Sequence, residues 1–186
     1  GKSLNNPTFS LNKSKGKSSL TFANTQTKNA VIDAAGKKNV ISFSLGKVNS
    51  AKINGSKGKE IIRIEEDAIM KGNAKMKLGS NEDSVAIDGI INKLTIDNGN
   101  DSDKDKVTVD AYNNIQGKLK VQNFGLEDKL VIDKDVFNYK SISDKDIRQD
   151  LKGIEIELLS EGLTIFLRPS WNDTGLICSR CCLLCH

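Results

Sequence analysis

Residues 41–64 read ISFSLGKVNSAKINGSKGKEIIRI, and this stretch decides the fold class. It contains three short runs in which apolar residues alternate with polar ones, namely Ile41–Leu45, Ala51–Ile53 and Ile62–Ile64. Residues typical of turns, including glycine, asparagine and serine, separate the runs. A period of two is typical of β-strands, and glycine lets the backbone turn a corner between them. The stretch therefore predicts three strands joined by tight turns.

The same alternation recurs along most of the 186-residue chain, at intervals of about 11 residues. The runs are Leu20–Phe22, Ala30–Ile32, Ile41–Leu45, Ala51–Ile53, Ile62–Ile64, Met76–Leu78, Val85–Ile87, Leu94–Ile96, Val107–Val109, Leu119–Val121, Leu130–Ile132, Ile154–Leu158 and Leu163–Ile165. The two prolines, Pro7 and Pro169, lie outside this repeat, and a proline inside a central strand would remove a ladder hydrogen bond. We therefore expect an all-β protein.

Two architectures suit many short strands at this spacing. One is an antiparallel β-sandwich, and the other is a parallel β-solenoid or β-roll with two strands in each coil of about 21 residues. Uniformly short strands and turns of similar composition favour the solenoid. We divide the chain into an N-terminal arm (1–15), a repetitive β domain (16–168) and a cysteine-rich tail (169–186). A short helical excursion is expected near 140–151, where Ser143 and Asp146 suit a helix start.

Composition argues against several function classes. Aromatic residues make up 5% of the chain, and His186 is the single histidine. Nucleic-acid bases often stack on aromatic side chains, and so few aromatics argue against a nucleic-acid partner. No nucleophile is paired with a base in the sequence, so we do not predict an enzyme. No small-molecule substrate is expected. No run of 18 apolar residues is present, so no helical membrane span is predicted.

Charge is distributed unevenly along the chain. Residues 1–80 contain 15 Lys/Arg and 5 Asp/Glu, a net +10, whereas residues 81–186 contain 13 and 19, a net −6. Complementary charges orient association, so the basic half of one copy is expected to meet the acidic half of another. The arm 1–15 has an apolar alternation of its own, at Thr8–Leu11, and is expected either to add to a neighbour's sheet edge or to be the first strand of its own domain.

Five expected strands end in aspartate, at Asp33, Asp88, Asp97, Asp110 and Asp133. Residues 98–103 read NGNDSD before a strand, and residues 119–132 read LKVQNFGLEDKLVI. On these features residues 81–167 resemble the hemolysin-type calcium-binding β-roll family of secreted proteins. The resemblance implies a calcium site, for which Asp97, Asn100, Asp101 and Asp103 are the candidate ligands. The tandem Gly-Gly-x-Gly-x-Asp turns of that family are missing, so the alternative is a polar turn that faces water.

The cysteines Cys178, Cys181, Cys182 and Cys185 all lie in the last nine residues, next to His186. Disulfides between chains are the favoured interpretation, because loops this short add little stability within one chain. Cys182, Cys185 and His186 also match the attachment pattern of c-type haem. A third possibility is a zinc or iron–sulfur site from two abutting Cys-x2-Cys pairs, and a fourth is a tail without a role.

Together these features predict a secreted structural protein. It would polymerise with copies of itself into an extracellular sheath, fibre or surface layer, and its tail would cross-link the chains. We expect it outside the cell or at the cell surface, with no cofactor favoured. The alternatives are an electron-transfer module with haem c and a calcium-binding, adhesin-like β-roll.

Overall fold

A computed structural model describes residues 2–11, 16–99, 101–110, 115–123, 127–133, 154–156, 165–168 and 177–178 of the chain. These residues form strands and turns and contain no helix. The helical excursion expected near 140–151 lies outside the described residues.

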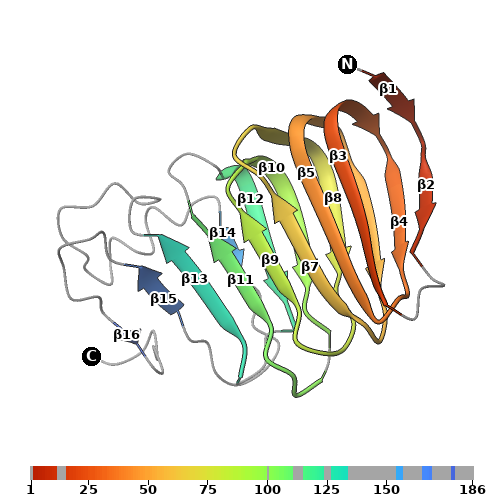
Figure 1. Ribbon diagram of the computed structural model, residues 1–186. Coiled ribbons are helices and arrows are strands. Elements are labelled where there is room, and N and C mark those ends of the chain that lie inside the picture. Colours follow the sequence, from red (N-terminus) through yellow and green to blue (C-terminus); the bar gives the residue numbers. More distant parts are fainter. Residues whose placement is uncertain are drawn as a thin grey trace.

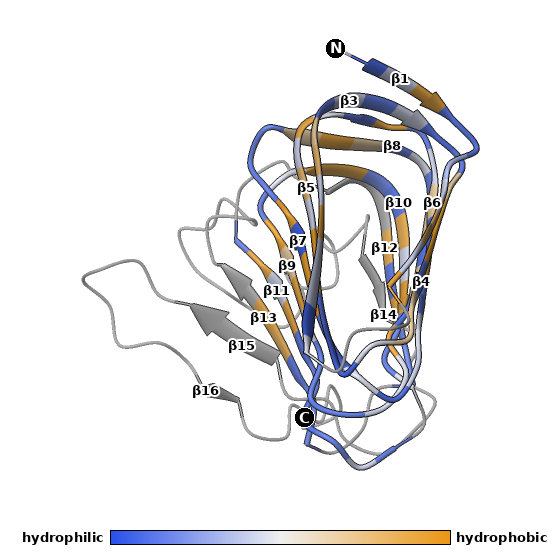
Figure 2. Cartoon of the chain, turned by 45° about the vertical axis from the view of Figure 1, so that its right-hand side comes forward, coloured by the Kyte–Doolittle hydropathy of each residue, from blue (hydrophilic) through white to orange (hydrophobic). Residues whose placement is uncertain are grey.

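The chain winds into a parallel β-solenoid of about five turns (Figure 1). Each coil crosses three sides, so the cross-section is a flattened triangle (Figure 2). The prediction of a parallel solenoid is confirmed, and the antiparallel sandwich is not the architecture of this chain. The third side of each coil was not anticipated, because its short strand segments continue directly from the longer strands before them.

The first side stacks strands in the order in which the coils follow one another. Its members are the N-terminal parts of β3 (Lys17–Lys28) and β5 (Lys38–Val48), then β7 (Lys59–Ile64), β9 (Ser84–Ile87), β11 (Lys106–Val109), β13 (Lys129–Asp133) and β15 (Ile165–Arg168). A last strand, β16 (Ile177–Cys178), pairs antiparallel with β15.

The other two sides are built by the same winding. The second, short side comprises β1 (Lys2–Asn5), the C-terminal parts of β3 and β5, and the first residues of β8 (Ala68–Lys77), β10 (Ile90–Asp97) and β12 (Ile115–Gln122). The third side comprises β2 (Thr8–Ser10), β4 (Ala30–Ala34), β6 (Ala51–Gly55), the remainder of β8, β10 and β12, and β14 (Ile154–Ile156).

Apolar residues stack on apolar residues in successive coils. On the first side Ile41, Ile62, Val85 and Val107 are register partners in turn, which gives coil lengths of 21 (62 − 41), 23 (85 − 62) and 22 (107 − 85) residues. All four side chains are at most 1% exposed. Inward alternation on all three sides thus fills one continuous core, and its burial stabilises the fold.

Corners between the sides use residues that tolerate a left-handed backbone. Asn24 and Leu45 have φ of 49° and 47° at the corner between the first and second sides. Asn6 and Asn29 have φ of 48° and 53° at the corner between the second and third sides. Asparagine adopts this region more readily than other non-glycine residues. Leu45 belongs to the alternation of residues 41–45, yet it is 57% exposed, because the chain turns there and directs it outward.

Residues of the N-terminal arm form the first, partial coil of the chain's own solenoid. Strand β1 pairs with β3, and β2 pairs with β4, both in parallel. Phe9 packs edge-to-face against Phe22, which stacks on Phe43 with ring centroids 5.0 Å apart. Among the described residues no strand pairs with the outer edges of β1 and β2, so one end of the stack presents unpaired backbone groups.

Candidate functional site

The corner between the third and first sides contains a column of buried acidic residues. Glu60, Asp83, Asp105 and Asp128 occupy the same place in four successive coils and are at most 4% exposed. The main-chain N–H of the first three donates to the carboxyl of the next coil: Glu60 to Asp83 Oδ1 at 2.7 Å, Asp83 to Asp105 Oδ1 at 2.8 Å, and Asp105 to Asp128 Oδ1 at 2.9 Å. We call these four residues the carboxyl column.

Two buried asparagines extend the column. Asn39 Nδ2 donates to Glu60 Oε1 at 3.0 Å, and Asn98 Nδ2 donates to Asp128 Oδ2 at 3.0 Å. The second carboxyl oxygens of Glu60 and Asp83 are buried with no hydrogen-bond partner within the described part of the chain. A buried charge without a partner is costly, so the neutral, protonated carboxyl is favoured there.

The pKa values of the column follow from that environment. The pKa of Asp105 is raised to about 8, mainly by burial and in smaller part by the charges of Asp128, Asp83 and Asp101, while a hydrogen bond from the Asp83 backbone lowers it. Burial likewise raises the pKa of Glu60 and of Asp83. At neutral pH Asp83 and Asp105 therefore hold protons that the same residues would release in the unfolded chain.

Sequence reasoning missed the carboxyl column, although a signal was present. Its members are spaced by 23 (83 − 60), 22 (105 − 83) and 23 (128 − 105) residues, which are the coil lengths of the solenoid. Acidic residues in turns are usually solvated, so nothing in their type suggested burial. Only the repeat of their spacing at one coil marks them as a stacked set.

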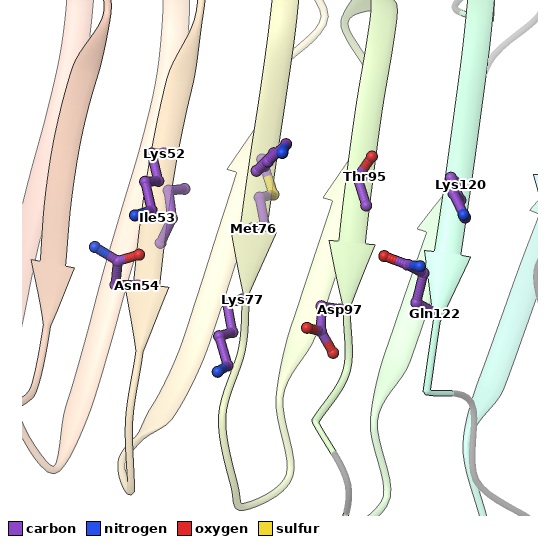
Figure 3. Close-up of a pocket in the computed structure, with 10 residues that line it drawn as sticks. Lys52, Ile53, Asn54, Met76, Lys77, Thr95, Asp97, Lys120 and Gln122 are labelled. Atoms are coloured by element: carbon purple, nitrogen blue, oxygen red, sulfur yellow. The ribbon is translucent and has the colours of Figure 1, made fainter. Parts of the chain in front are cut away.

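A second feature is a groove of about 620 Å³ on the outer surface of the third side (Figure 3). Strands β6, β8, β10 and β12 line it side by side. Its polar lining residues are Lys52, Asn54, Lys75, Lys77, Thr95, Asp97, Lys120 and Gln122. Four of these eight side chains are lysines, and one is acidic, so the groove is positively charged.

Of the residues predicted as calcium ligands, Asp101 lies near enough to the carboxyl column for its charge to raise the pKa of Asp83 and of Asp105. Asp97 Oδ1 accepts hydrogen bonds from Asn123 Nδ2 at 2.7 Å and from the Gly99 N–H at 3.2 Å. Asp101 Oδ1 accepts from the Asp103 N–H, and Asp103 Oδ2 accepts from the Asn81 N–H. Asn100 lies outside the described residues. Within the described part of the chain no group of three or more His, Cys, Asp or Glu is arranged to hold a metal ion.

The strand-ending aspartates do not converge on one place. Asp33 lies on the third side, where its Oδ1 accepts from Asn54 Nδ2 at 2.6 Å, and Asp97 lies on the same side. Asp88 and Asp110 follow β9 and β11 of the first side, and burial together with the charge of Asp110 raises the pKa of Asp88. Asp133 ends β13, also on the first side. They therefore belong to at least two separate stacks.

The cysteine tail is described only in part. Cys178 is the second residue of β16 and is the register partner of Ile165. Cys181, Cys182, Cys185 and His186 lie outside the described residues, so the disulfide, zinc and haem predictions remain predictions.

The fold places the chain in the class of parallel β-solenoid proteins. Comparisons with protein-family models, curated proteins and solved structures find no match to it. No helix of the described residues has the length and apolar character needed to cross a membrane.

Proposed function

We propose that this chain is an extracellular structural subunit whose solenoid stacks end to end with other copies. The observation that carries the proposal is the open edge formed by β1 and β2, which within the described part of the chain pair with other strands on one side only. An open parallel edge offers N–H and C=O groups in register to another strand. Successive coils of this chain already pair their backbone N–H and C=O groups in this way, so a second copy can continue the same hydrogen-bonding pattern.

The geometry of β2 identifies which backbone groups face the open edge. The Leu11 N–H donates to Asp33 O, and Pro7 O accepts from the Val31 N–H, so residues 7 and 11 face β4. Alternate residues of a strand direct their backbone groups to opposite neighbours. The N–H of Thr8 therefore points toward the open edge, and an incoming strand would bond to it.

Charge and core support the same arrangement. The first coils belong to the half of the sequence with net +10, and the later coils belong to the half with net −6, so head-to-tail stacking brings opposite charges together. Phe9 and Leu20 at the open end are only partly buried against the core. A stacked neighbour would cover them and add apolar burial. Contacts of this heterologous kind build filaments when they do not close into a ring.

Replacing Thr8 by proline tests the open edge. The substitution removes the N–H that faces the edge while the bonds to β4 remain, so we expect assembly to be lost and the melting temperature of the monomer to change little. Thr8→Ala is the matched control, because it removes the side chain and keeps the N–H. Sedimentation velocity and electron microscopy report assembly. Equal assembly of T8P and T8A, or a wild-type chain that stays monomeric at high concentration, would contradict end-to-end stacking through this edge.

The second part of the proposal is that the tail makes the union covalent. Under oxidising conditions we expect cross-linked oligomers on a non-reducing gel, and thiol treatment should return them to monomers. A chain with Ser at positions 178, 181, 182 and 185 should run as a monomer under both conditions and should still assemble reversibly. If the wild-type protein migrates as a monomer without reductant, the proposed cross-link is contradicted. The proposal of end-to-end stacking is tested separately by the Thr8 variants.

A further inference from the structure

The third side of the solenoid carries lysines in register on neighbouring strands. Lys52 of β6 and Lys75 of β8 are direct register partners, and Thr95 and Lys120 follow in the same row on β10 and β12. Adjacent strands lie about 4.8 Å apart, so Lys52 and Lys75 leave the sheet side by side. Like charges directly opposite one another destabilise a sheet. A bound anion would relieve that repulsion.

The groove offers its lysines little compensation of their charge. On the first side Lys17, Lys38 and Lys59 also form a row, but Lys59 pairs with Glu82 at 3.4 Å. Within the described part of the chain Lys52, Lys75 and Lys77 form no ion pair. The acid in the groove lining, Asp97, has one oxygen occupied by Asn123 and Gly99. Lys77 is the register partner of that acid, so the uncompensated charge of the groove is at Lys52 and Lys75.

The shape of the groove suits an extended ligand. It runs across four neighbouring strands, a distance of about 14 Å at the usual strand spacing. Asn54, Thr95 and Gln122 supply amide and hydroxyl groups among the lysines, as the close-up in Figure 3 shows. A second hollow of about 160 Å³ adjoins it, shares Lys52 and Lys75, and adds Asn29, Ser50 and Asn73. The ligand would therefore meet positive charge and neutral hydrogen-bonding groups along the same line.

We propose that this groove binds an extended, carboxylate-bearing polysaccharide. Lysine is a compact point charge that suits single carboxylates, whereas paired recognition of phosphate is typical of arginine, which is absent from the lining. Amide and hydroxyl side chains suit sugar hydroxyls. No aromatic side chain lines the groove for stacking on bases. Leu45 is the one large apolar residue exposed among the described residues, and it lies at the corner between the first and second sides. The groove on the third side therefore has no apolar patch that could enter a lipid surface.

The site lies on a lateral side of the solenoid. End-to-end stacking uses the edges of β1 and β2, so the groove stays open in a stacked assembly. The inference therefore goes beyond the proposed function and does not depend on it. A stacked fibre would carry one such groove in every copy, which would attach it along its length to an acidic glycan matrix.

The test is a titration of the full chain with polygalacturonate oligomers at low ionic strength, in which calorimetry measures the binding. We expect the double variant K52Q/K75Q to bind at least about tenfold more weakly than wild type, and added salt to weaken the wild-type complex. The matched control is K38Q/K59Q, which removes the same charge from a lysine row in register on the first side. That control should bind within about twofold of wild type.

Several outcomes would overturn the proposal. Equal weakening by K52Q/K75Q and K38Q/K59Q would mean that net charge, and not the groove, attracts the polymer. Binding of neutral dextran as tightly as polygalacturonate would exclude the lysines as its basis. Tighter binding of a single-stranded oligonucleotide, or of phosphatidylserine vesicles, would assign the surface to a different class of partner. Circular dichroism of both double variants shows whether the solenoid is intact, and since the four side chains lie on the surface, we expect unchanged spectra.

Discussion

The Asp105→Asn variant should be more stable than wild type at pH 8 by more than about 2 kcal/mol and nearly equal to it at pH 4. Burial raises the pKa of Asp105 from 3.8 to about 8 in the folded chain. Between these values the folded state binds more protons than the unfolded state, so the free energy of unfolding falls as the pH rises through this window. Asparagine keeps an oxygen that accepts from the Asp83 N–H and removes the group that must ionise.

Urea unfolding followed by circular dichroism between pH 4 and pH 8 measures this effect. The wild-type chain should lose stability across the window, and the variant should lose less. Asp103→Asn is the control, because the Asp103 carboxyl accepts from the exposed N–H of Asn81 and stands outside the carboxyl column. Parallel curves for wild type and D105N would show that the column ionises without cost and would contradict the pKa given above.

Replacing Gly79 by alanine should destabilise the solenoid by more than about 3 kcal/mol. Gly79 has φ of +109°, a backbone conformation that residues with a Cβ rarely adopt. A Cβ built there would also lie 2.1 Å from the carbonyl oxygen of Ser56 in the preceding coil. That oxygen accepts a hydrogen bond from the Ser80 N–H at 2.8 Å, so the backbone cannot move away without breaking contact between coils.

Gly16→Ala is the matched control for this prediction. A Cβ at Gly16 meets no atom within 4 Å, and its φ is not in the left-handed region. Thermal unfolding should therefore show a large drop in melting temperature for G79A and little change for G16A. Equal melting temperatures for the two variants would mean that the corner at Gly79 relaxes freely, which would contradict close packing of the coils at this corner.

The fold was predictable from the sequence because one signal is repeated many times. The alternations at Ile41–Leu45, Ile62–Ile64 and Val85–Ile87 each carry weak information, but their common spacing indicates one repeated unit. The short second side was not predictable in this way. Its segments, such as Gly46–Val48, continue directly from a longer strand, and only the corner at Leu45 separates them.

The candidate sites were less accessible to sequence reasoning than the fold. Burial of Glu60 or Asp83 depends on which residues stack above and below, and that information exists only once the register of the coils is known. The lysines of the groove were visible in the sequence as single charges between apolar residues. Lys52 and Lys75 become a pair because β6 and β8 are neighbours, although 23 residues (75 − 52) separate them.

Because the hydrogen bonds in the carboxyl column all run in one direction, the two ends of the solenoid should differ in their resistance to unravelling. The acceptor for each column N–H is supplied by the following coil, so Asp83 depends on Asp105, and Asp105 depends on Asp128. Peeling a coil from the C-terminal end would leave the column N–H of the new last coil without its acceptor, whereas peeling from the N-terminal end would leave the remaining donors satisfied. A pulling experiment should therefore find that the force required to unravel the protein differs between its two ends.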